Sequence, residues 1–158
     1  MTTMTKQPKI HVQPATSSDI PDLVNLLDAL FNIEQDFSAD HCKQTAGLRM
    51  LIESPERGTI QVAHTASGEI VGMVSAQLVI STAEGAPSAW LEDMVVDQRF
   101  RAQGIGRLLL KSALDWAKEK GATRAQLLVD IDNLPAVGYY NHLGWSTSRM
   151  GMRRIMLK

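Results

Sequence analysis

A short apolar strand that leads through two glycines into an apolar helix constrains this chain more than any other segment. The strand covers residues 90–96, and Gly104 and Gly106 stand at the start of a helix predicted over residues 104–120. The first N–H groups of a helix have no partner within it, and the helix dipole places positive charge there. Because glycines let an anion approach that backbone closely, the segment predicts a phosphate site.

The residues around the two glycines exclude the common nucleotide loops. A dinucleotide-binding fingerprint requires a third glycine where Leu109 stands, and a Walker loop requires Gly-Lys followed by Ser or Thr. The pattern Arg101-x-x-Gly104-x-Gly106 instead resembles the acyl-CoA pyrophosphate loop of the GNAT superfamily of N-acetyltransferases. The strand–loop–helix setting is also the one that this family uses.

A second motif lies in residues 133–145 and is similar to the pattern Asn-x-x-Ala-x-x-x-Tyr-x-x-x-Gly-Phe of the same superfamily. Asn133 and Tyr140 match it, and Trp145 replaces the usual Phe. The two motifs follow each other in the family's order, with one helix and one strand between them. The resemblance therefore rests on two independent matches within residues 91–145.

Hydrophobic periodicity predicts an α+β chain with about four helices and a mixed sheet. The expected strands cover residues 10–13, 59–63, 70–80, 90–96, 126–129, 145–148 and 153–157, the expected helices cover residues 20–31, 40–52, 104–120 and 133–143, and residues 81–88 form a loop. Because a helix separates the strands at 90–96 and 126–129, these two strands should be parallel. The resemblance implies the GNAT fold over residues 10–157: a mostly antiparallel sheet whose central parallel strands splay apart.

The resemblance also implies acetyl-CoA as the cosubstrate. Its pyrophosphate would lie on the backbone amides of residues 103–107, with Arg101 and Arg107 adding charge, and its pantetheine arm would pair with the strand near the gap and with Asn133. The expected cofactor-binding residues are Met94, Val95, Val96, Arg101, Gln103, Gly104, Ile105, Gly106, Arg107 and Asn133. No His or Cys spacing indicates a metal site.

Acyl transfer to an amine needs a group that removes a proton, because an alkyl amine with a pKa of ~10.4 is protonated at neutral pH. Glu92 is our first candidate for this catalytic base and Asp93 the second, since alternation along a strand directs only one of them into the cleft unless a bulge intervenes. The N–H of Val95 or Val96 would stabilise the oxyanion. The resemblance assigns Tyr140 to the leaving thiolate.

Composition narrows the class of protein. The 158 residues, 44% of them hydrophobic, suit a single domain over residues 1–158, of which we expect 1–9 to be flexible. A net charge of −1 gives no reason to expect nucleic acid, and no apolar run reaches the ~20 residues of a membrane span. The single cysteine, Cys42, excludes an intrachain disulfide, and the polar N-terminus lacks a signal-peptide core. We therefore expect a cytoplasmic protein.

The charge is divided unevenly along the chain. Residues 1–98 carry 13 acidic and 5 basic side chains, whereas residues 99–158 carry 4 acidic and 11 basic ones. A basic half suits a polyanionic cofactor and an acidic half suits a cationic amine, although charge pairing between the halves would give the same division. The resemblance implies an acetyl-CoA-dependent N-acetyltransferase that works by direct attack, and the acidic half leads us to expect a small cationic amine as its acceptor.

Three alternatives remain open at the level of sequence. In the first, the enzyme acetylates a protein lysine or N-terminus in place of a small amine. In the second, the chain is a non-catalytic acyl-CoA-binding sensor. In the third, the glycine loop binds a nucleotide. A strand at residues 153–157 would lie at a sheet edge, where two copies of the chain can pair as a homodimer.

Overall fold

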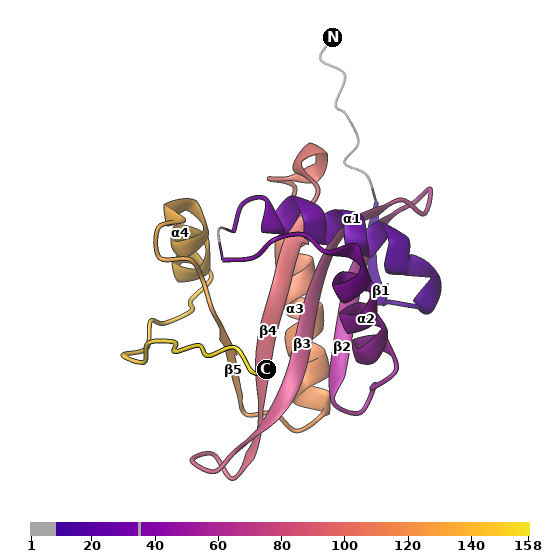
Figure 1. Ribbon diagram of the computed structural model, residues 1–158. Helices are drawn as coiled ribbons and strands as arrows, with labels where there is room; N and C mark the ends of the chain where they lie inside the picture. Colours follow the sequence, from indigo (N-terminus) through magenta and orange to yellow (C-terminus); the bar gives the residue numbers. More distant parts are fainter. Residues whose placement is uncertain (1–8, 35) are drawn as a thin grey trace. The chain divides into compact units, whose positions relative to one another are not determined.

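The computed structural model describes residues 9–34 and 36–158, and these form two compact units, one up to Leu128 and one from Val129 to Lys158. The expected flexibility of residues 1–9 concerns a segment that lies almost wholly outside the described residues. In the described part the elements are β1 (Ile10–Pro14), η1 (Ser17–Asp19), α1 (Ile20–Phe31), α2 (His41–Ile52), β2 (Gly58–Thr65), β3 (Ile70–Ser81), β4 (Ala86–Val96), η2 (Gln98–Phe100), α3 (Ile105–Glu119), β5 (Arg124–Leu127) and α4 (Leu134–His142) (Figure 1).

One sheet with the strand order β1-β2-β3-β4-β5 forms the centre of the first unit. Its neighbours are antiparallel except β4 and β5, which are parallel, as the intervening helix predicts. The parallel pairing runs only from Ser88–Arg124 to Leu91–Leu127, whereas β4 continues to Val96. The expected mixed, mostly antiparallel sheet with a parallel pair that separates is therefore confirmed.

Helices α1 and α2 cover one face of this sheet, in front of it in Figure 1. The apolar stripe of α1, which includes Leu23 and Leu27, packs against Val62, Met73 and Val95 of three successive strands. The start of α2 follows from its sequence, because the side chain of Asp40 accepts a hydrogen bond from a backbone N–H of the first turn.

Helix α3 lies on the opposite face of the sheet, behind it in Figure 1. Its buried residues include Leu109 and Leu110, and its Ser112 hydroxyl donates a hydrogen bond to Oε1 of Gln61 on β2 at 2.8 Å. Gln61 and Val62 are adjacent on β2 and so face opposite layers. In the described residues no helix is long and apolar enough to cross a membrane.

The expected loop at residues 81–88 is wrong at its second half. Strand β4 begins at Ala86, which pairs with Ser81, so only a short turn joins β3 to β4. Gly85, with φ of 62°, supplies the left-handed residue of this turn. The antiparallel ladder continues through residues whose composition favours a loop, because pairing with an existing strand outweighs local propensity.

The two expected terminal strands, at residues 145–148 and 153–157, are also wrong. The second unit contains helix α4, and its residues from Trp145 onward form no strand. Every residue from 151 to 158 is exposed, including Ile155 and Leu157. An alternating pattern forms a strand only where a neighbour accepts its hydrogen bonds, and the edge strand on which we based the homodimer is therefore not present.

Core packing by α3 gives a direct test of the fold. Leu109 is fully buried, whereas the adjacent Leu108 is 44% exposed. We expect Leu109→Ala to lower the free energy of unfolding by about 2–5 kcal/mol, because it leaves a cavity beside β3. Urea unfolding measures this change, with Leu108→Ala as the matched control that loses about 1 kcal/mol or less. Equal losses in the two variants would contradict the observed orientation of α3.

Candidate active site

A β-bulge in β4 lies where the two candidate carboxylates stand. Glu92 pairs with Ser75 and Val95 pairs with Met73, so β4 has one more residue than β3 between these pairs. Asp93 takes a φ of 51°, a left-handed conformation that is uncommon outside glycine. The extra residue breaks the regular alternation of side chains, and so Glu92 and Asp93 are no longer required to face opposite sides of the sheet.

The two carboxylates differ in their surroundings. Asp93 is half-buried, whereas Glu92 is exposed. The pKa of Asp93 is raised to about 6 in all: burial contributes most, the negative charges of Glu92 and Glu34 also raise the pKa, and a hydrogen bond with Ser75 lowers it. A carboxyl group with such a pKa titrates close to neutral pH, as a general base requires.

The backbone of β4 is available on one edge beyond Leu91. The N–H of Asp97 donates to the carbonyl of Val71 on β3 at 2.8 Å. Since backbone groups of successive residues alternate between the two edges of a strand, the N–H and C=O of Val96 face away from β3. The Val96 carbonyl accepts a hydrogen bond from Nε of Arg101 at 3.1 Å. Of the two expected oxyanion donors, the Val96 N–H is therefore on the edge that β5 does not cover.

The start of α3 has the form of an anion site. Gly104 is the N-cap residue with φ of 80°, and a Cβ at this position would meet no atom within 4 Å. Ile105 is buried beneath, while Gly104 and Arg107 are exposed. The N–H groups of the first helical turn have no partner within the helix, so they lie at an open surface where a phosphate can approach.

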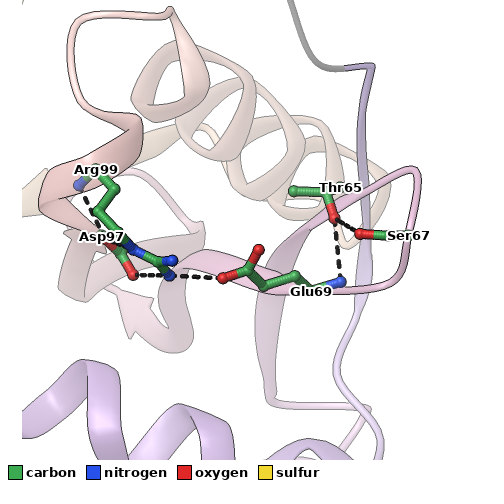
Figure 2. Close-up of polar contacts among 5 residues, drawn as sticks. All are labelled: Thr65, Ser67, Glu69, Asp97 and Arg99. Carbon is green, nitrogen blue, oxygen red and sulfur yellow. Dashed lines mark hydrogen bonds and ion pairs between the residues drawn. The ribbon is translucent and has the colours of Figure 1, made fainter.

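A polar network that the sequence did not reveal borders this loop. The guanidinium of Arg99 in η2 bonds both Asp97 and Glu69, and Glu69 belongs to the turn between β2 and β3 (Figure 2). A cavity of about 780 Å³ lies beside it, lined by Arg99, Arg101 and both polar and apolar residues of α1, among them Asp22, Leu26 and Ala29. Glu69 and Arg99 are far apart in sequence, and only the closeness of Asp97 to Arg99 could have suggested part of this contact.

The second unit holds the two remaining expected residues. Asn133 caps α4, its Oδ1 accepting the Ala136 N–H at 3.3 Å. The ring of Tyr140 lies edge-on to those of Tyr139 and Trp145, with centroids 5.5 and 6.0 Å away. Trp145 thus packs within this unit as the aromatic residue that the motif expects at its end.

The first unit therefore contains most of the expected cofactor-binding residues. Residues 94–96 form the uncovered edge of β4, and the loop from Arg101 to Arg107 presents glycine backbone and two arginines next to it. This donor set fits a diphosphate followed by an amide-bearing arm. Within the described ranges, no group of three or more His, Cys, Asp or Glu side chains is placed to hold a metal ion.

Comparison with protein families agrees with a site for an acyl-CoA donor. The acetyltransferase (GNAT) family model matches residues 23–145, and the chain therefore belongs to this family. The family is one of acetyltransferase enzymes, and both sequence motifs lie within the matched range or at its end.

Individual relatives match over shorter stretches. An uncharacterized N-acetyltransferase of Methanocaldococcus jannaschii is 34% identical over 80 residues, which cover 50% of this chain and 35% of that protein. The streptothricin acetyltransferase of Streptomyces lavendulae is 33% identical over 90 residues, covering 54% of this chain and 43% of the relative. The chain thus spans less than half the length of these two relatives.

Among solved structures, the aminoglycoside N-acetyltransferase AAC(6′)-Iy in complex with CoA has a similar fold. The TM-score is 0.81 at 15% identity, and the match covers 98% of this chain and 99% of that protein. At this identity the likeness concerns the fold alone.

The raised pKa of Asp93 predicts how stability depends on pH. Its ordinary value is 3.8, so ionisation of Asp93 between about pH 4 and 6 destabilises the folded state, and the free energy of unfolding falls as the pH rises. Relative to the unsubstituted protein, we expect Asp93→Asn to gain roughly 2–3 kcal/mol between pH 4 and pH 7. Urea unfolding at both pH values measures this gain. Asp132→Asn, which removes an exposed carboxylate, is the control, and an equal gain in both variants would contradict the assignment.

Proposed function

We propose that this protein is an N-acetyltransferase that moves an acetyl group from acetyl-CoA to an amine by direct attack. One observation carries the proposal: a half-buried carboxyl with a raised pKa, Asp93, stands on the bulge of β4 that leads to the uncovered edge and the glycine loop. The three parts are a base, a backbone edge for an amide-bearing arm, and a diphosphate site. Their order along one strand and one loop is the order of groups in acetyl-CoA.

Asp93, rather than Glu92, is the better candidate for the general base. With a pKa of about 6 it is ionised at neutral pH, yet it is far more basic than an ordinary carboxylate. Taking a proton from a free alkylammonium would still be uphill by roughly 6 kcal/mol, because the two pKa values differ by about four units. The amine therefore reacts as its neutral form, after the ammonium proton has passed to solvent. As the nitrogen bonds to the thioester carbon its remaining N–H becomes acidic, and Asp93 takes that proton, either directly or through water.

The remaining steps use backbone and a phenol. As the amine nitrogen bonds to the carbonyl carbon, the carbonyl oxygen becomes an oxyanion, which the Val96 N–H stabilises by a hydrogen bond. Collapse of this intermediate breaks the C–S bond and releases the CoA thiolate. As expected from the sequence motif, we propose that Tyr140 donates a hydrogen bond to this thiolate. A phenol is a weaker acid than a thiol, so stabilisation of the thiolate accounts for its role better than full proton transfer.

Acetyl-CoA would be held by the groups already described. The amides of Gln103, Gly104 and the first turn of α3 bind the pyrophosphate, and Arg107 adds a charge-assisted bond. Residues Met94 to Val96 pair with the pantetheine arm, and Asn133 is retained as a residue near it. Acetyl-CoA supplies the activated acyl group as a thioester.

A small cationic amine is the acceptor that we favour. The first 98 residues carry a large excess of acidic side chains, and Glu34 and Glu92 act electrostatically on Asp93. A negative field of this kind attracts cations and raises their local concentration. The name of the streptothricin acetyltransferase also points to an amine-bearing small molecule as that relative's substrate.

A CoA-release assay over a panel of amines tests the reaction and the identity of the base. The panel includes polyamines, aminoglycosides, amino acids and a lysine peptide. For the best acceptor, we expect kcat/KM to rise with pH through about 6, and Asp93→Asn to lower kcat by roughly 100- to 10,000-fold. Glu92→Gln, the adjacent matched variant, should lose less than about tenfold.

Other outcomes of that assay are equally informative. If Glu92→Gln abolishes turnover and Asp93→Asn does not, Glu92 is the base. If calorimetry shows acetyl-CoA binding but no amine gives CoA release, the protein is a sensor domain. If thermal unfolding shows stronger stabilisation by ATP or NAD than by CoA, the glycine loop is a nucleotide site.

Gly104 offers a separate test of the diphosphate site. Alanine at a φ of 80° is strained by about 1 kcal/mol, and its Cβ would project into the open space where the phosphate approaches. We expect Gly104→Ala to weaken acetyl-CoA binding by about tenfold, measured by calorimetry. Gly47→Ala in the interior of α2 is the control, because it should stabilise the protein by about 0.5–1 kcal/mol and leave binding unchanged. Unchanged binding in both variants would move the diphosphate away from this loop.

A further inference from the structure

The loop between β4 and α3 is bordered by a cavity on the side of α1. Asp97, Arg99 and Arg101 line this cavity of about 780 Å³ together with Asp22 and Asn25 of α1. Close packing therefore does not fix the position of the loop on this side. Loops without packed apolar contacts open locally at low free energy unless polar contacts hold them.

Arg99 supplies such contacts in two directions. Its Nη2 lies 2.9 Å from Oδ2 of Asp97, and its Nε lies 3.2 Å from Oδ1 of the same residue. The same Nη2 bonds Oε1 of Glu69 at 2.5 Å. Glu69 is fixed in turn, because its N–H donates to Oγ1 of Thr65, whose hydroxyl also bonds Ser67 (Figure 2). Arg99 thus joins the start of the loop to the turn between β2 and β3.

The network also organises the loop itself. Asp97 accepts the backbone N–H of Arg99 at 2.9 Å and so caps η2. The guanidinium of Arg99 lies 5.3 Å from the ring centroid of Phe100. The hydrogen bonds from Arg99 lower the pKa of Asp97, and so they favour its ionised form in the folded state. These contacts involve Asp97, Arg99 and Phe100.

The ion pairs of Arg99 should affect ligand affinity more than the stability of the whole domain. Arg99 is 63% exposed and Glu69 is 44% exposed. Exposed ion pairs of this kind contribute little compared with the stability of the whole domain. A small free-energy difference between two conformations of one loop nevertheless changes the affinity of a ligand bound by that loop several-fold.

We propose that Arg99 is a positioning residue for the acyl donor. By joining Asp97 to Glu69 it holds the β4–α3 loop in the conformation that directs the amides of Gly104 and the first turn of α3 toward a diphosphate. Arg99 itself does not contact the donor. This inference rests on the proposed function, since it assumes that the loop binds acetyl-CoA.

Arg99→Gln tests the proposal, because glutamine keeps part of the side chain and removes the charge. We expect KM for acetyl-CoA and the Kd of CoA measured by calorimetry to rise about two- to fivefold, with kcat at saturating acetyl-CoA changed less than twofold. Lys111→Gln is the matched control, because it removes a similarly exposed ion pair, with Asp115, from the middle of α3. A fall in kcat with KM unchanged, or the same rise in KM in the control, would overturn the proposal.

Glu69→Gln provides the second variant and remains informative if Arg99→Gln folds poorly. Glu69 lies on the turn between β2 and β3, and its side chain bonds Arg99. In our proposal it affects CoA through this contact. We expect it to raise the Kd of CoA, and to have no further effect when Arg99 is already replaced. Additive effects of the two substitutions would contradict a shared mechanism. If the unsubstituted protein binds no CoA at all, the proposed function fails and this inference fails with it, whereas normal binding that neither variant weakens overturns this inference alone.

Discussion

The pairing of β4 is the constraint on which the rest of the site depends. Its antiparallel ladder with β3 extends over the whole strand, whereas its parallel ladder with β5 ends at Leu91. In the described part of the chain no strand therefore pairs with the N–H and C=O of Val96 on one side, and such a strand edge accepts a further extended chain. A pantetheine arm has the amide groups to occupy that edge, and the glycine loop follows where its diphosphate would lie.

The bulge gives this strand its second property. The extra residue of the bulge places the carboxyl of Asp93 in a half-buried position. There, burial and two neighbouring carboxylates raise its pKa. The left-handed backbone of Asp93 stores strain that the two flanking ladder pairs maintain. A regular strand would have separated Glu92 and Asp93 onto opposite faces. The same local irregularity that interrupts the sheet therefore creates a group suited to proton transfer.

Charge acts at two levels in this protein. The excess of acidic residues before position 99 and of basic residues after it is a property of the chain, and it favours a cationic acceptor and an anionic donor. The contacts of Arg99 are a property of the fold, because Glu69 and Asp97 come from separate parts of the chain. The guanidinium of Arg99 bonds these two carboxylates, and that of Arg101 bonds the Val96 carbonyl. We therefore propose that the glycine backbone, more than Arg99 or Arg101, binds the acyl donor.

The sequence by itself determined the elements whose pattern is local. Helices α1, α2 and α3 follow from hydrophobic periodicity, and each formed within a residue of its expected range, with the two glycines at the start of α3. Only the tertiary structure decided the bulge at Asp93, the extension of β4 to Ala86, the absence of strands after Trp145, and the contact of Arg99 with Glu69. These features depend on which segments become neighbours. A hydrogen-bond ladder or an ion pair needs a partner that no local pattern identifies.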